Sequence, residues 1–213
     1  MSLQKYSQRI RETMRGTNSI QPEMVMDSAL RDAKRLKERP DLWPVLDIGC
    51  GEAYHVQTNI EHGIPTIGVD LDDGQLYLAQ KRALKELGRY LPLVRGDARQ
   101  LPIQNDSFGS VTSYGMLMMI PWVIEEIERK SIYQDKDTVR EVARQILSEM
   151  KRVIRPSGEI KIVTMSDKYA GERKYFKPIP AELKELGISE GLMPLSVDYH
   201  RRDERFIEAL FKK

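Results

Sequence analysis

The stretch VLDIGCGEAYHV, residues 45–56, decides the fold, because it changes from a strand pattern to a turn and then to a helix within a few residues. Its first four residues are an apolar, partly β-branched run that predicts a buried strand. Gly49 and Gly51 follow, and glycine lets the backbone turn tightly and approach a ligand without a Cβ in the way. The helix expected after them presents free N–H groups at its first turn. The stretch therefore predicts a ligand-binding turn beyond the carboxyl end of a strand in an open α/β sheet.

Further strand and helix patterns alternate along the chain. Short apolar runs at residues 66–69, 91–94, 110–113 and 160–164 are candidate strands. Between them, apolar residues recur at helical spacing over residues 76–87 and 139–154. This alternation predicts parallel βαβ units with both faces of the sheet covered by helices.

Both ends of the chain add to this core. Residues 1–40 predict two helices joined near Gly16 to Ser19, the second starting at Pro22 and stopped by Pro40. The last twenty residues have apolar stretches on either side of the charged HRRDER, residues 200–205, which predicts an antiparallel hairpin. We expect one domain over 1–213: a helical lid or cap in 1–40, a ligand-binding core in 44–165, and a helix and hairpin in 166–213.

Composition excludes several classes of protein. The 213 residues are 40% hydrophobic and carry 34 basic and 32 acidic side chains, so the chain lacks the strong basic excess of a dedicated nucleic-acid binder. Residues 1–40 hold nine Lys or Arg against five Asp or Glu, a surplus best explained by a solvated helix face. A single cysteine, no apolar run long enough to cross a bilayer and no secretory signal predict a cytoplasmic protein.

The turn does not fit a dinucleotide. The dinucleotide fingerprint needs a glycine three residues after Gly51, where this chain has Tyr54, and a dehydrogenase is therefore a distant alternative. Asp47, two residues before the first glycine, is a poor neighbour for a pyrophosphate. Its carboxylate would attract a ligand that carries an ammonium and a sulfonium group.

Two further acids stand at strand ends. Asp70 ends the second strand, where a carboxylate can accept both hydroxyl protons of a ribose; the alternative, a cap for the next helix, is already served by Asp72 or Asp73. In LVRGDARQLP, residues 93–102, the Asp97 carboxylate and the Ala98 N–H are placed to recognise an adenine edge, although Gly-Asp-Ala alone is an ordinary turn.

Taken in order, these motifs resemble the class I S-adenosylmethionine-dependent methyltransferases of the small, stand-alone type. The resemblance also includes DSFGSVTSYGML (106–117) and LSEMKRVIRPSGEIKIV (147–163), and it covers Val45 to Thr164. It implies a Rossmann-like, doubly wound, seven-stranded sheet, mostly parallel with a C-terminal antiparallel hairpin. The implied cofactor is S-adenosylmethionine, with S-adenosylhomocysteine as product.

The resemblance also assigns contacts to the donor. The turn would hold the methionine part, the end of the second strand the ribose, and the third strand the adenine; the residues are Asp47, Gly49, Gly51, Asp70, Leu71, Asp97, Ala98 and Tyr114. One departure is Ala53, where the family often has a third glycine, but alanine is the smallest replacement and we expect the site to survive. Cys50 is expected to be packing, and RPSG (155–158) a turn into a strand.

The acceptor site is less well defined. The stretch SYGMLMMIPW, residues 113–122, lacks the Asn-Pro-Pro-Tyr of methylases that grip a planar nitrogen, and its methionines predict an apolar, adaptable pocket. Tyr114, Met118 and, from the first helix, Tyr6 are candidate acceptor contacts, although an aromatic after a strand is equally often core. His55, His62 and His200 are too scattered to predict a metal site.

These features predict in-line transfer of a methyl group to a small molecule. Such a reaction needs alignment and exclusion of water, and it needs a general base only when the nucleophile must lose a proton. The alternatives are an RNA or protein methylase that docks through the basic N-terminal helices, and a non-catalytic S-adenosylmethionine-binding module. The acceptor, the attacked atom and the oligomeric state stay open.

Overall fold

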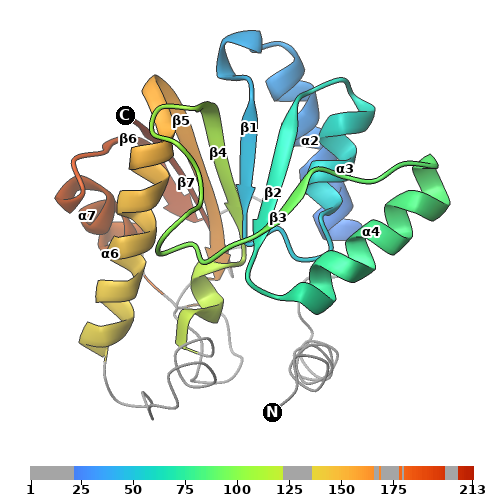
Figure 1. Cartoon of the computed structure of the whole chain (residues 1–213). Helices are drawn as coiled ribbons and strands as arrows, with labels where there is room; N and C mark the ends of the chain where they lie inside the picture. Colours follow the sequence, from blue (N-terminus) through green and yellow to red (C-terminus); the bar gives the residue numbers. More distant parts are fainter. Residues whose placement is uncertain (1–21, 122–135, 166–167, 169–177, 179, 200–205) are drawn as a thin grey trace. The chain divides into compact units, whose positions relative to one another are not determined.

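The structure, a computed structural model, describes residues 22–121, 136–165, 168, 178, 180–199 and 206–213 (Figure 1). The helix expected before Gly16 lies outside these residues, as does the HRRDER segment. Seven strands form one mixed sheet with the hydrogen-bonded order β3-β2-β1-β4-β5-β7-β6. The chain divides into two compact units, residues 1–97 and 98–213, described below in turn. The single-domain organisation stays a prediction.

Unit 1 alternates helices with three parallel strands. Its elements are α2 (Pro22–Lys37), the 3-10 helix η1 (Pro40–Leu42), β1 (Val45–Ile48), α3 (Tyr54–Glu61), β2 (Thr66–Asp70), α4 (Asp73–Leu87) and β3 (Leu93–Arg95). β1 pairs with β2, and β2 with β3, all in parallel. The carboxyl ends of the three strands therefore meet at one edge.

Local sequence explains where these elements begin and end. All four residues of β1 are buried, as expected for a strand covered on both faces. α2 covers Pro22–Lys37, and because the described residues start at Pro22, the predicted helix start there stays a prediction. α4 is capped by Asp72, whose carboxylate accepts from the amides of Gly74 at 2.7 Å and Gln75 at 3.3 Å. It ends at Gly88 in the left-handed conformation that commonly closes a helix.

Two groups of buried apolar side chains hold unit 1 together. One joins α2 and η1 to β1: Ala33, Leu36, Leu42, Val45 and Ile64. The other joins the turn after β1 and α3 to α4: Ala53, Val56, Ala79, Ala83 and Leu91. The second group packs α4 directly against the predicted ligand-binding turn.

Unit 2 carries the antiparallel end of the sheet. Its elements are β4 (Phe108–Tyr114), the 3-10 helix η2 (Leu117–Met119), α6 (Lys136–Val153), β5 (Ile154–Met165), α7 (Pro180–Ser189), β6 (Met193–Tyr199) and β7 (Phe206–Lys212). β4 and β5 are parallel, whereas β7 pairs antiparallel with both β5 and β6. The predicted C-terminal helix and reversed hairpin are confirmed.

One boundary differs from the prediction. The helical pattern was expected to run through Ile154, and RPSG to be a turn, but α6 ends at Val153 and β5 starts at Ile154. Phe108 pairs with Ile154, and Ser110 pairs with Glu159, so a step of two residues along β4 corresponds to a step of five along β5. Residues 155–158 therefore form a bulge inside the strand. A Cβ at Gly158 would lie 2.8 Å from the Gly109 carbonyl oxygen, which explains why the bulge contains a glycine.

None of the helices in the described ranges is both long enough and apolar enough to cross a bilayer.

Candidate functional site

The turn after β1 is held on the end of β2. The amides of Gly49 and Cys50 both donate to the Val69 carbonyl, at 2.8 and 3.1 Å, and the amide of Ala53 donates to the Cys50 carbonyl at 2.7 Å. Gly49 and Gly51 have φ angles of 70° and 52°, in the left-handed region that glycine enters at little cost. The predicted role of both glycines in shaping the turn is therefore visible in the backbone.

Ala53 continues this pattern without being a glycine. Its φ is 58° and its ψ 36°, a conformation that costs an ordinary residue roughly 1–2 kcal/mol, and its side chain is fully buried. Ala53 is also the N-cap of α3, and it has no side chain that could accept from the first amides of the helix. A helix end without a capping side chain suits the carboxylate of a ligand, because the amides and the helix dipole both favour negative charge.

Asp70 lies beside the turn and binds to it. Its Oδ2 accepts from the Gly51 amide at 2.7 Å and its Oδ1 from the Asp72 amide at 2.9 Å. Burial raises the pKa of this carboxyl, and the hydrogen bonds from the Asp72 and Gly51 amides oppose that shift. The Leu71 amide opposes this pKa shift as well. A carboxylate offers about four acceptor positions, so these backbone amides leave part of its capacity for other donors, such as a ribose hydroxyl group.

Asp47 and Asp97 belong to the same edge of unit 1. Asp47 is 2% exposed on β1 and lies in register with Gly68 of β2. Gly96 donates its amide to the Asp70 carbonyl at 2.9 Å, which holds the Gly96–Asp97 turn at the end of β2. Leu71 and Asp97 are half-buried. Unit 1 thus gathers six of the eight predicted donor residues at the ends of three adjacent strands.

Cys50 is not a reactive thiol. Burial, followed by the negative charges of Asp47 and Asp70, raises the pKa of its thiol well above the usual value, so the group stays protonated and weakly nucleophilic. Its Sγ would lie 2.9 Å from a Cβ placed on Gly68, so the side chain fills the space over β2. Packing, the predicted role, is the role its surroundings support.

The other predicted site residues belong to unit 2 or lie outside the described part. Ala98 is half-buried. Tyr114 is half-buried at the end of β4, with the Lys161 Nζ 5.9 Å from its ring centroid. Met118 is buried in η2, at 1% exposure. Tyr6 and His200 lie outside the described residues. Within those residues, no three His, Cys, Asp or Glu side chains are grouped so as to hold a metal ion.

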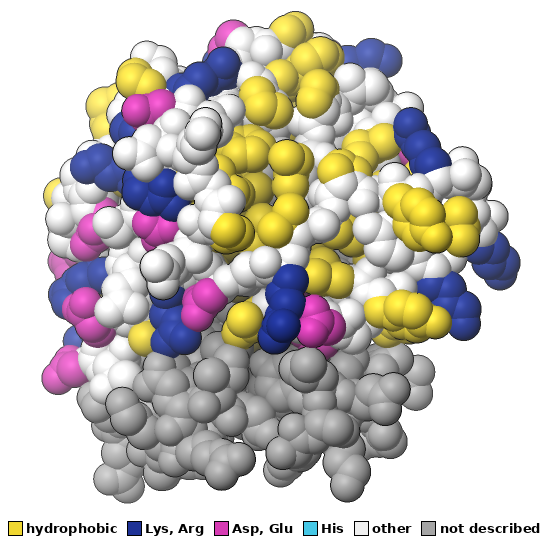
Figure 2. All heavy atoms as spheres, in the orientation of Figure 1, with side chains coloured by type: hydrophobic (Ala, Val, Ile, Leu, Met, Phe, Trp, Pro, Cys, Tyr) yellow, Lys and Arg dark blue, Asp and Glu magenta, His cyan; other side chains and the backbone are white. Residues whose placement is uncertain are grey.

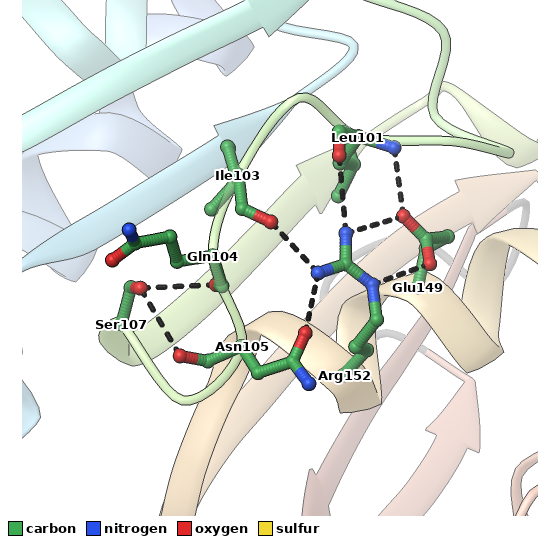
Figure 3. A network of polar contacts seen from close by, with 7 residues as sticks. All are labelled: Leu101, Ile103, Gln104, Asn105, Ser107, Glu149 and Arg152. Atoms are coloured by element: carbon green, nitrogen blue, oxygen red, sulfur yellow. Dashed lines mark hydrogen bonds and ion pairs between the residues drawn. The ribbon is translucent and has the colours of Figure 1, made fainter.

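A polar clamp that the sequence prediction missed holds the loop before β4 (Figure 3). The Arg152 guanidinium donates to the carbonyls of Leu101 and Ile103, at 3.1 and 2.7 Å, and to the Asn105 side chain at 2.7 Å. Glu149 receives two hydrogen bonds from Arg152, at 2.6 and 2.7 Å, and one from the Leu101 amide at 2.7 Å.

The clamp also explains two pKa shifts within α6. The hydrogen bond from Arg152 lowers the pKa of Glu149, and the same bond raises the pKa of Arg152. The available sequence signal was an acid and a base three residues apart on one helix, which is also the pattern of an ordinary exposed pair.

Comparison with known proteins identifies the family of this fold. The sequence model of a family described as "Methyltransferase domain" matches residues 46–162. The chain is 30% identical over 175 residues to a tRNA U34 carboxymethyltransferase of Tolumonas auensis, covering 77% of this chain and 48% of the relative. It is 30% identical over 135 residues to a demethylmenaquinone methyltransferase of Streptomyces avermitilis, covering 63% and 47%. The chain thus spans about half the length of these curated relatives.

Solved structures show the same fold at low identity. The magnesium protoporphyrin IX methyltransferase of Synechocystis, solved with bound S-adenosylhomocysteine, matches with a TM-score of 0.65 at 14% identity, over 96% of this chain and 92% of that one.

Proposed function

This chain belongs to the methyltransferase-domain family and to its S-adenosylmethionine-dependent class, and from that premise we propose that it transfers a methyl group from S-adenosylmethionine to a small molecule. The observation that carries the proposal is the edge of unit 1. There, the first turn of α3, whose N-cap Ala53 supplies no capping side chain, and the Asp70 carboxylate, which is held by the Gly51 and Asp72 amides, lie at the ends of adjacent strands. S-adenosylmethionine supplies an electrophilic methyl group on a sulfonium, and S-adenosylhomocysteine is the product.

Each donor residue has a role that follows from its chemistry. The first amides of α3 and the turn at Gly49 and Gly51 bind the methionine carboxylate, and Asp47 attracts the ammonium. Asp70 accepts from the ribose hydroxyls, with Leu71 beside it. Together these groups neutralise and orient the donor, which leaves its methyl group to be aligned with the acceptor.

The acceptor is proposed to bind near the end of β4. Tyr114 and Met118 would form part of an apolar acceptor site, and Met118 is buried. The adenine contacts of Asp97 and Ala98, and the acceptor contact of Tyr6, stay predictions. No general base is assigned: an amine or a thiolate already carries the lone pair that attacks, whereas a phenol or a quinol would have to lose a proton first.

A small-molecule acceptor agrees with the apolar sequence after β4 and with the name of the Streptomyces relative, a demethylmenaquinone methyltransferase. The test is formation of S-adenosylhomocysteine by the purified protein with a panel of phenols, amines, thiols and quinols. Turnover above the acceptor-free rate with one class supports the proposal. Turnover with RNA alone contradicts it.

RNA is a second candidate acceptor, favoured by the exposed surface of α4 and of the residues just after it. Tyr77 of α4 and Tyr90 beyond its end are 66% and 70% exposed, and Lys81 and Lys85 of α4 and Arg89 after it are exposed as well. Figure 2 shows yellow and dark blue side chains next to one another over α4, at the right of the view. Aromatic rings that stack on bases and cations that contact phosphates are what single-stranded RNA requires. The relative from Tolumonas bears the name of a tRNA-modifying enzyme.

This second candidate is tested by fluorescence anisotropy with a single-stranded RNA at several salt concentrations. Lys81→Glu should weaken binding and reduce the salt slope by about one, as expected for a lost phosphate contact. Lys184→Glu, an exposed lysine of α7, is the matched control and should change neither. Equal effects of the two variants would remove α4 as an RNA-binding face.

A binding module without catalysis would take up S-adenosylmethionine and turn over no acceptor, and the same panel separates it from an enzyme. A cytoplasmic location stays a prediction.

A further inference from the structure

Arg82 of α4 reaches across to the turn after β1. Its Nη2 donates to the Glu52 carbonyl oxygen at 2.6 Å, and its Nε donates to the Gln57 side chain of α3 at 3.1 Å. The side chain is 15% exposed, which is low for an arginine. Arg82 therefore bridges three segments of unit 1: α4, α3 and the turn.

The rest of the guanidinium is enclosed as well. Its central carbon lies 3.7 Å from the ring centroid of Tyr54, the first residue of α3. Nη1 lies 3.6 Å from the Glu52 carboxylate, and Nε lies 3.9 Å from that of Glu86. A planar fork that both stacks and donates in several directions is particular to arginine, so lysine can replace only part of this arrangement.

The Glu52 carbonyl is an important atom to hold, because it belongs to the peptide that joins Glu52 to Ala53. The orientation of this peptide depends on the φ angle of Ala53, and that angle is in the left-handed region. Alanine disfavours this region, whereas glycine enters it readily. A charged donor on the preceding carbonyl opposes rotation of the peptide back to an ordinary conformation.

α4 holds Ala53 from a second direction. The Ala53 methyl group is buried in the apolar cluster that includes Ala79 and Ala83, and Ala83 is next to Arg82 in the helix. One surface of α4 therefore fixes both the side chain of Ala53 and the peptide before it.

We propose that Arg82 is a positioning residue for donor binding: by holding the Glu52 carbonyl it keeps Ala53 left-handed, so that the first amides of α3 point at the donor carboxylate. The inference rests on the proposed function, because the ligand of those amides is the methionine part of S-adenosylmethionine. Arg82 itself touches the turn and α3 and acts through them.

The experiment is calorimetric titration of S-adenosylmethionine into the full chain and its variants. Arg82→Gln should weaken donor binding about tenfold, the equivalent of one lost charge-assisted hydrogen bond. The donor affinity of Arg82→Lys should lie between that of Arg82→Gln and that of the unaltered protein. Arg140→Gln, which removes an arginine paired with Glu182 at 2.8 Å on other helices, is the matched control and should bind normally.

A second substitution separates positioning from general packing. Glycine needs no help to become left-handed, so Ala53→Gly should improve donor affinity about fivefold more in the Arg82→Gln background than in the unaltered one. Loss of packing between α3 and α4 would not be relieved by that change. Thermal unfolding without donor should show the same coupling among the unaltered protein, Arg82→Gln, Ala53→Gly and the double variant.

The outcomes are distinct. Donor binding by Arg82→Gln within twofold of the unaltered protein overturns the proposal, as does additivity of the two substitutions in both measurements. If Arg82→Gln does not fold, the cycle is run with Arg82→Lys. If the unaltered protein binds no donor, the proposed function fails, and the coupling in thermal unfolding still decides whether Arg82 holds Ala53.

Discussion

Replacing Asp70 with asparagine separates the two tasks that the structure gives this side chain. The carboxylate accepts from the amides of Gly51 and Asp72, at 2.7 and 2.9 Å, and its remaining acceptor capacity is proposed to bind the donor ribose. Asparagine has the same shape but a single acceptor oxygen. Its amide nitrogen must face either a backbone N–H or a ribose hydroxyl.

The magnitudes follow from these contacts. One backbone amide loses its partner, at a cost of about 1–3 kcal/mol, and removal of a buried charge offsets part of that cost. We therefore expect Asp70→Asn to lower the free energy of unfolding by no more than about 2 kcal/mol. Donor affinity should fall at least about tenfold, since a hydrogen bond to a charged group contributes about 1.5–3 kcal/mol.

The pH dependence gives a second signature of the same group. Burial raises the pKa of Asp70 in the folded state. The stability this brings is fully present below the pKa of the unfolded chain, and it is lost as pH rises through the folded value. For donor binding the sign is reversed, because the ribose needs the ionised carboxylate, so affinity should fall as pH is lowered toward the raised pKa. In Asp70→Asn both dependences should be reduced.

Isothermal titration between pH 5 and 8, together with urea unfolding, measures both effects. Asp73→Asn is the control, since that carboxylate is 45% exposed and pairs with Arg95 at 3.3 Å. Donor affinity in Asp70→Asn that matches the unaltered protein at every pH would refute the assignment of the ribose to this residue.

Three further substitutions test the scaffold. Asp72→Ala removes the cap of α4 and should lower the free energy of unfolding by about 1 kcal/mol in urea titration; no change would mean that the cap is not needed. Gly187→Ala places a Cβ against the buried ring of Phe211, so the melting temperature should fall, with a cost of about 1–3 kcal/mol or more, and an unchanged melting temperature would contradict the tight contact. Glu149→Gln should cost about 2 kcal/mol at pH 7. Because the hydrogen bond from Arg152 lowers the pKa of Glu149, this difference should be lost as pH falls from the usual glutamate pKa through the lowered folded value; a cost that persists in acid would contradict it.

The parts of the site that were predicted from sequence depend on local pattern. The strand at Val45–Ile48, the glycine turn and the strand-ending Asp70 are contiguous signals, and parallel strands necessarily bring their carboxyl ends to one edge. The predicted capping role of Asp72 is likewise a relation between near neighbours.

The parts that were missed depend on distant or ambiguous contacts. Arg82 meets Glu52 across thirty residues of sequence, so no short window shows the pair. That Ala53 leaves the donor site intact stays a prediction, but its left-handed conformation could not be predicted from the local pattern, because alanine itself disfavours that conformation. The start of β5 was missed because Val153 and Ile154 are both apolar, and the helical pattern continues smoothly into the strand.

The most direct measurement is calorimetric titration of the purified chain with S-adenosylmethionine, S-adenosylhomocysteine and NAD. Saturable binding of both sulfur ligands in the micromolar range, and none of NAD, is the predicted result. Binding of neither sulfur ligand, or binding of NAD in their place, would contradict the assignment of the turn and Asp70 to a methyl donor.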